Sequence, residues 1–314
     1  MNAHDIGRAA TAALHDELAL SPKPGLVTFT SNGSHRDMDA QTFLRSISSL
    51  RPYFVRIAQL GATGAEFHEL ERAGIAAEAR MLEATGGVNT HRGAIFLLGL
   101  LCASAGAIAA GRRRPTPEAL RATLIERWGE ALHRRASRPS TLPGGIAARR
   151  LGLRSASEEA AYGFPAVFET AVPAMRSAIA RGLSLERAQF DTLFHLMATL
   201  DDSNLAHRGG LDGLRFAQRA ARQFIERGGA ADADAIARAE AIAVDFEARR
   251  LSPGGSADML AATCWMRRIG AIEATEGIDR IDRLGGIETS ALSVPPGERD
   301  ERGVVSGQAF LALP

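Results

Sequence analysis

Lysine is almost missing from this chain of 314 residues. Of its 37 basic residues one is a lysine, Lys23, so the other 36 are arginine. A general preference for arginine explains why lysine is scarce on the surface. The one lysine that remains, Lys23, lies between two prolines in the segment Ser21–Gly25. A compact ammonium donates hydrogen bonds where a planar guanidinium does not fit. We therefore expect a specific role for Lys23.

The sequence also has few cysteines, a net charge close to zero and no segment typical of a signal peptide. The two cysteines, Cys102 and Cys264, provide no disulfide framework, which is typical of a reducing compartment. A net charge of +1 argues against a general binder of nucleic acid or of membrane surfaces. Residues 1–8 show no basic start followed by an apolar run, so no signal peptide is predicted. We expect a cytoplasmic protein with no nucleic-acid or membrane partner, whose anion sites are local.

Helical periodicity runs through most of the chain. Phe43, Ile47, Leu50, Phe54 and Ile57 follow one apolar stripe, and the abundant alanine and arginine are good helix formers. Besides the segment with this stripe, helices are expected at residues 4–20, 66–84, 92–110, 117–135, 158–181, 186–200, 211–227, 233–250 and 257–272.

The fold class predicted from this pattern is all-α. Residues 1–271 are expected to form a single globular multi-helix domain whose functional loops converge at one site. The uncharged run 93–110 reaches the length of a membrane span, but Gly, Ser and Ala dilute it, so a buried central helix is expected. Pro165 and Pro173 should each start or kink a helix. Residues 272–314 lose the periodicity and are predicted to be an irregular C-terminal tail.

The first polar loop, around residues 21–39, combines a lysine with alternating histidine and acid. Lys23 is a candidate phosphate ligand. His35, Asp37 and Asp39 alternate, which suits a metal or proton-transfer site if the side chains converge. The alternative is that one of the two aspartates caps the next helix.

The second loop ends in Arg92 and precedes a helix. Gly86-Gly87 allows backbone N–H groups to approach a ligand, and the following helix start adds partial positive charge. These features predict a polyphosphate cradle, although the lysine of a Walker A loop is missing. A turn capped by Asn89 or Thr90 is the alternative.

Two later loops repeat this chemistry. Asp202 is the second of two adjacent aspartates after an apolar segment, and such acids are costly to bury without a cation such as Mg²⁺. Asn204 and Arg208 come next, and Gly254-Gly255 precedes Ser256, a reasonable N-cap. The alternatives are an exposed helix end and a plain capped turn.

At these loops the sequence resembles the triphosphoribosyl-dephospho-CoA synthase family. The matching stretches are Ser21–Val27, Asn32–Asp39, Thr85–Phe96, Glu158–Ala161, Gly163–Pro165, Asp202–Gly210 and Leu251–Asp258. The residues Asn32–His35 and Ala40–Ser46 are similar to the branch that serves malonate decarboxylase rather than citrate lyase.

The resemblance implies a transferase that joins ATP to 3′-dephospho-CoA, with adenine released and Mg²⁺ as the expected cofactor. The product, 2′-(5″-triphosphoribosyl)-3′-dephospho-CoA, would be passed to a carrier-protein holo-synthase as a prosthetic-group precursor. The 2′-hydroxyl of dephospho-CoA would attack C1′ of the ATP ribose through an oxocarbenium-like transition state. That chemistry needs a base, cations for three phosphates and a proton donor for adenine.

The candidate residues fall into two groups by role. Those expected to bind the nucleotide phosphates are Lys23, Gly86, Gly87, Asn89, Arg92, Asn204, Arg208 and Ser256. Those expected to act in catalysis are Asp39 and Asp202, as base or Mg²⁺ ligands, with His35 and His91 as proton carriers.

Two other functions remain open from the sequence. One is an N-glycosidic hydrolase of the kind that removes ADP-ribose, also found among helical proteins with acidic metal loops. The other is a non-catalytic, nucleotide-binding assembly factor. A homo-oligomer is likewise left open.

Overall fold

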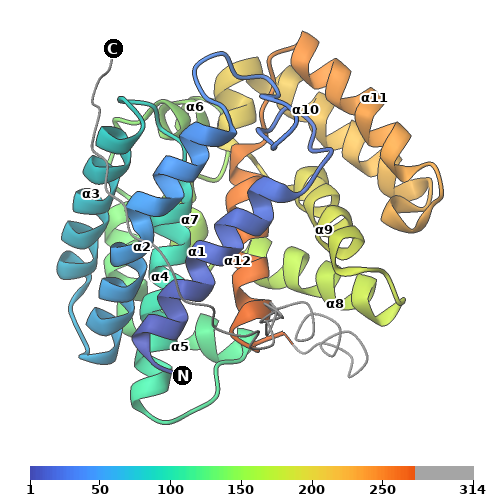
Figure 1. Cartoon of the computed structure of the whole chain (residues 1–314). Helices are drawn as coiled ribbons and strands as arrows, with labels where there is room; N and C mark the ends of the chain where they lie inside the picture. The colour runs from blue at the N-terminus through green and yellow to red at the C-terminus, as the bar shows by residue number, and fades with distance from the viewer. Residues whose placement is uncertain (273–314) are drawn as a thin grey trace, which may run out of the picture. The chain divides into compact units, whose positions relative to one another are not determined.

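The computed structural model describes residues 1–272, which form an all-α fold (Figure 1). This part of the chain holds twelve α-helices, one π-helical segment and one 3₁₀ turn, and no strand occurs in it. In chain order the elements are α1 (Ala3–Ala19), α2 (Ala40–Ala62), α3 (Phe67–Ala84), α4 (Arg92–Ala110), α5 (Pro117–Ala136), α6 (Pro143–Leu151), α7 (Ala156–Ala161), η1 (Ala166–Ala171), α8 (Val172–Ala180), α9 (Leu185–Thr199), α10 (Ser203–Glu226), η2 (Gly229–Ala231), α11 (Ala235–Ala248) and α12 (Gly254–Arg268). The predicted fold class is confirmed, whereas the predicted tail lies, from residue 273 on, outside the described residues.

Helix α4 is the centre of the protein. Its residues are almost all apolar and most are buried, because α1, α2, α3, α5 and α12 pack around it. Among the described residues it is the one helix long and apolar enough to cross a membrane, a property that buried core helices share. The predicted buried central helix is confirmed.

Helices α2 and α4 approach each other closely through glycines. A Cβ atom at Gly106 would lie 2.0 Å from the carbonyl oxygen of Ala58, and one at Gly61 would lie 1.9 Å from that of Ala103. The two glycines therefore let the backbones touch, and the apolar stripe of α2 is buried from Ile47 to Ile57, with Leu50 and Phe54 completely inaccessible.

Helices α1 and α12 join the two halves of this helical unit. Figure 1 shows α2, α3, α4 and α5 on one side, α8 to α11 on the other, and α1 and α12 between them. Trp265 of α12 is completely buried, and its indole N–H donates to the carbonyl of Ile6 in α1 at 3.2 Å. The joint between α1 and α12 is thus part of the core.

The structure differs from the predicted helices in three places. The single helix expected at 158–181 is broken into α7, η1 and α8, because Gly163 and Phe164 adopt positive φ angles just before Pro165. Helix α10 begins at Ser203 instead of residue 211, with a kink at Gly210. Helix α6 was not predicted, since its nine residues are too few for a clear periodicity.

Candidate functional site

A cavity of about 680 Å³ lies where the loops of the first half meet those of the second half. Its volume falls within the range of roughly 300 to 1,000 Å³ typical of small-molecule sites. One wall is apolar and includes Leu14, Phe43 and Phe96, while polar loops form the rest. The cavity can therefore hold a ligand with both an apolar and a strongly polar part.

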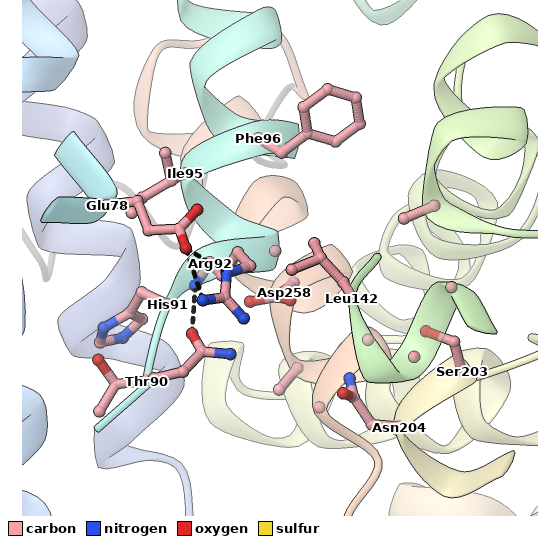
Figure 2. A pocket seen from close by; sticks show the side chains of 18 of the residues that line it. Glu78, Thr90, His91, Arg92, Ile95, Phe96, Leu142, Ser203, Asn204 and Asp258 are labelled. Atoms are coloured by element: carbon pink, nitrogen blue, oxygen red, sulfur yellow. Dashed lines mark hydrogen bonds and ion pairs between the residues drawn. The ribbon is translucent and has the colours of Figure 1, made fainter. Parts of the chain in front are cut away.

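Several helices begin at this cavity. The first residues of α4, α6, α10 and α12 line it, and Figure 2 shows Arg92, Leu142, Ser203 and Asn204 from three of these starts around one space. The first N–H groups of a helix lack partners within the helix and carry partial positive charge. Several such ends around one cavity produce a local anion site in a chain whose net charge is close to zero.

Glycines allow three of these helix starts to pack together. A Cβ atom at Gly254 of α12 would lie 2.9 Å from the side-chain nitrogen of Asn204 in α10. One at Gly144 of α6 would lie 3.1 Å from the hydroxyl of Ser203. Larger residues at these two positions would push α6 and α12 away from α10.

Asp202 stands between the starts of α10 and α12. One carboxylate oxygen accepts from the backbone N–H of Asn204 at 2.9 Å. The other accepts from the backbone N–H and the hydroxyl of Ser256, at 2.9 and 3.1 Å. Burial raises the pKa of Asp202, while these donors lower it. Asp202 thus joins two helix ends, and it lines a second cavity next to this one rather than the first.

The arginines at the cavity differ in whether a carboxylate neutralises them. Arg92 donates to Glu78 at 2.6 Å, as Figure 2 shows, and Arg135 pairs with Glu71. Arg208 donates instead to His35 and to the carbonyl of Arg250, with no carboxylate within ion-pair distance in residues 1–272. Arg208 therefore keeps its charge available for an anionic ligand.

His35 at the cavity has a defined tautomer. Arg208 can only donate, so Nδ1 of His35 accepts from it at 3.1 Å, and Nε2 donates to the hydroxyl of Ser252 at 2.9 Å. Burial, with the charge of Arg208, lowers the pKa of His35 to about 4. His35 is therefore neutral at pH 7.

His91 is held in a chain of hydroxyl groups. Thr90 donates to Ser46 at 2.7 Å, and the Ser46 hydroxyl shares a hydrogen bond with Nδ1 of His91, also at 2.7 Å. The other ring nitrogen, Nε2, is buried without a partner in the described part of the chain. Burial, with the charge of Lys23, lowers the pKa of His91 to about 3.

Two further carboxyl groups, one on α1 and one on α12, line the cavity. Glu17 of α1 forms an ion pair with Lys23, whose ammonium also donates to the backbone carbonyl of Glu17. Burial lowers the pKa of Lys23, and the neighbouring Glu17 raises it. Asp258 of α12 lies against Gly93, where a Cβ atom would come within 1.9 Å of its carboxyl oxygen.

The predicted site residues divide evenly between those that line this cavity and those that do not. The residues that line it are His35, Asn89, His91, Arg92, Asn204 and Arg208. The residues outside its wall are Lys23, Asp39, Gly86, Gly87, Asp202 and Ser256.

Each residue outside the wall has a structural environment of its own. Lys23 is buried with Glu17, and Asp202 is bonded to Ser256. Asp39 is exposed and caps α2 by accepting from the Thr42 N–H at 2.8 Å, as the capping alternative predicted. Gly86-Gly87 forms the turn after α3, with positive φ angles and open space around it.

The expected Mg²⁺ ligands do not come together at the cavity. Neither Asp39 nor Asp202 lines it, and no group of three or more metal-ligating side chains occurs within residues 1–272. The binding of Mg²⁺ by these two residues stays a prediction without support from the geometry.

Comparison with known proteins shows the family. The profile described as CitG, ATP:dephospho-CoA triphosphoribosyl transferase, matches residues 3–276. The chain belongs to this family. It is 40% identical over 273 residues to the Pectobacterium atrosepticum protein named 2-(5″-triphosphoribosyl)-3′-dephosphocoenzyme-A synthase, covering 83% of this chain and 88% of that protein.

Other members of the triphosphoribosyl transferase family have a comparable sequence identity to this chain. A Vibrio cholerae O1 protein with the same name, prefixed "Probable", is 39% identical over 272 residues, covering 83% of this chain and 86% of its own length. The Acinetobacter calcoaceticus protein with that prefixed name is 37% identical over 260 residues, covering 83% and 89%. No solved structure matches this family member.

Sequence reasoning missed several residues that line the cavity of this transferase. Gly144-Gly145 is a further Gly-Gly pair at a helix start, so the signal was available. Asp258 was part of a matching stretch but was not placed in the site. Glu17 lies inside an ordinary amphipathic helix. The one feature of the sequence that could have pointed to it is the unusual Lys23, which needs an acidic partner when buried.

The buried neutral histidines predict how stability depends on pH. Unfolded histidines take up a proton near pH 6.5, whereas folded His91 does so only near pH 3. Between these values the unfolded state binds more protons, so the free energy of unfolding falls as the pH falls, by up to about 1.4 kcal/mol per pH unit for this residue. Urea unfolding at pH 7.5, 6 and 5 should show a weaker dependence in His91→Gln. The exposed His4→Gln is the matched control, and equal slopes in all three proteins would contradict the assignment.

Proposed function

We propose that this enzyme transfers the triphosphoribosyl group of ATP to the 2′-hydroxyl of 3′-dephospho-CoA and releases adenine. The family and the names of its relatives support the reaction. The observation that carries the proposal is the cavity lined by several helix starts, among them those of α4, α6, α10 and α12, and by Arg208, which has no carboxylate within ion-pair distance among residues 1–272. Such a site fits a ligand with several phosphates.

The shape of the site suits two nucleotides. A second cavity, of about 510 Å³, shares Ala156, Ser203 and Gly255 with the first. We place the triphosphate at the helix starts, and the apolar wall with Phe43 and Phe96 beside the ATP base and ribose. The hydroxyl of dephospho-CoA then reaches C1′ from the side opposite to the departing adenine.

Mg²⁺ belongs to this proposal as part of the ATP substrate. The ion keeps several waters and is often held by substrate phosphates with one or two carboxylates. Because no cluster of protein ligands is found within residues 1–272, the phosphate oxygens would provide most of its coordination. The metal would spread the charge of the triphosphate and help to fix its position.

The test of the function is the release of adenine by the purified protein with MgATP, in the presence and absence of 3′-dephospho-CoA. We expect adenine only when the acceptor is present, together with an acceptor that has gained the mass of a triphosphoribosyl group. Adenine from ATP alone would indicate the N-glycosidic hydrolase. ATP binding with no adenine under either condition would indicate the assembly factor.

Arg208→Ala should weaken ATP binding while the protein stays folded. The residue is on the cavity wall, and its removal takes away a charged hydrogen bond to phosphate worth roughly 1.5 kcal/mol or more. We expect the KM for ATP to rise roughly tenfold. Arg8→Ala removes the same charge from the exposed side of α1 and is the control. An unchanged KM in Arg208→Ala would remove this residue from the phosphate site.

The biological setting is proposed from the sequence. We propose a cytoplasmic enzyme whose product is the precursor of the malonate decarboxylase prosthetic group and is passed to a carrier-protein holo-synthase. The similarity at Asn32–His35 and Ala40–Ser46 supports that branch. Assays of the product with purified holo-synthases of both branches would discriminate between them, and size-exclusion chromatography would test for a homo-oligomer.

A further inference from the structure

The side chains first considered as the base are already engaged. Both ring nitrogens of His35 have partners, and burial lowers the pKa of His91 to about 3, so its ring is a weak proton acceptor. Both oxygens of Asp202 accept protein hydrogen bonds, and Asp39 lies outside the cavity wall. Acid–base chemistry at this cavity therefore needs other groups.

Glu17 is a carboxylate fixed in place at the cavity. It is 5% exposed, and one oxygen is bound by the ammonium of Lys23, whose side chain is entirely buried. Among residues 1–272 no hydrogen bond involves its second carboxylate oxygen, and the residue lines the cavity. The other acids paired at this cavity, Glu71 and Glu78, are both about one-third exposed, so Glu17 is the most strongly desolvated of the paired acids.

Asp258 is a carboxyl group without a cation. It lines the same cavity next to the start of α4, accepts from the backbone N–H of Ala94, and forms no ion pair within residues 1–272. Figure 2 shows it between Arg92 and Leu142. Asp258 belongs to α12 and Glu17 to α1, two helices that pack on each other, so the two groups are held on rigid elements.

We propose that Glu17 and Asp258 are the acid–base pair of the transfer, an inference that rests on the proposed function. Glu17 accepts the proton of the acceptor 2′-hydroxyl as its oxygen forms the new bond to C1′. The C1′–N9 bond breaks with its electron pair on adenine, and Asp258 donates a proton to the departing base. Glu17 then loses its proton to solvent and Asp258 regains one, which restores the starting state.

The surroundings of the two carboxyl groups differ in charge. Burial raises the pKa of Asp258 well above its usual range, and the nearby charges of Glu17 and Asp202 raise it further, against the Ala94 N–H. Glu17, in contrast, faces the ammonium of Lys23. Two carboxyl groups whose environments differ in this way are typical of an acid and a base in glycosyl transfer.

The first test is the rate of adenine release by Glu17→Gln and Asp258→Asn, with MgATP and 3′-dephospho-CoA. Each should lower kcat roughly 10²- to 10⁴-fold with KM values within a few-fold of those of the wild type. The residual activity of Asp258→Asn should no longer fall at alkaline pH, where the wild type loses its acid. Asp16→Asn, one residue from Glu17 but paired with Arg268 on the other side of α1, is the charge-matched control and should keep wild-type rates.

The second test distinguishes a role of Asp258 as the proton donor from a purely structural role. With 6-chloropurine riboside triphosphate, whose base leaves more readily than adenine, the defect of Asp258→Asn should shrink at least tenfold, whereas that of Glu17→Gln should not. If Glu17→Gln does not fold, Glu17→Asp keeps the charge but withdraws the carboxylate, and its kcat should fall by a similar factor. Less than tenfold loss in either variant, or equal Asp258→Asn defects with both nucleotides, would overturn the pair. Absence of acceptor-dependent adenine release in the wild type would instead reject the proposed function itself.

Discussion

Lys23→Met should lower the free energy of unfolding by about 3 to 5 kcal/mol, the cost of leaving a buried charge without its partner. Methionine fills a similar volume, so the change mainly removes the ammonium. Glu17 is 5% exposed, and Lys23 donates to both its carboxylate and its backbone carbonyl. The measurement is urea unfolding at pH 7, followed by circular dichroism.

A second variant identifies the cause of this loss. Lys23→Met combined with Glu17→Gln should recover part of the stability, because no uncompensated charge is then buried. Lys23→Arg should stay destabilised, since the larger planar group does not fit the space of the ammonium. Wild-type stability in Lys23→Met would show that the ion pair makes no net contribution to the fold.

Gly106→Ala should destabilise the protein by about 3 kcal/mol, at the upper end of the usual cost of overpacking. Its new methyl group would lie 2.0 Å from the Ala58 carbonyl oxygen, and backbone atoms cannot rotate away as a side chain can. Helices α2 and α4 would have to separate. Because α4 begins at the cavity, we also expect activity to fall in this variant.

The matched control for Gly106 is Gly129→Ala in α5. A methyl group there meets only Ile125, at an ordinary contact distance of 3.4 Å. Alanine is the better helix former by about 1 kcal/mol, so this variant should be as stable as the wild type or more so. Equal behaviour of the two variants in urea unfolding would contradict the role assigned to the α2–α4 contact.

The fold was largely predictable because long helices produce a clear hydrophobic periodicity in the sequence. The stripe through Leu50 and Phe54 and the uncharged run of α4 correspond to buried surfaces. The short α6 was missed because two helical turns carry little periodicity. The break after α7 depends on the positive φ angle of Phe164, a conformation that non-glycine residues seldom adopt and that a sequence does not reveal.

The site was predictable only in part, for a different physical reason. Polar residues before helices were visible, and six of them line the cavity. Whether such a residue faces a ligand or another protein group depends on packing between distant segments. Asp202 faces Ser256, 54 residues away, and Lys23 faces Glu17, and neither contact can be read from local spacing.

The burial of the single lysine has a practical consequence for chemical labelling. Since Lys23 is the one lysine of the sequence and its side chain has no exposed surface, the native protein presents no ε-amine to acylating reagents. Modification of Lys23 therefore requires the loop or α1 to open first. The rate at which it is acylated under native conditions would report the opening of this region, and a saturating substrate that closes the cavity over Glu17 should slow it.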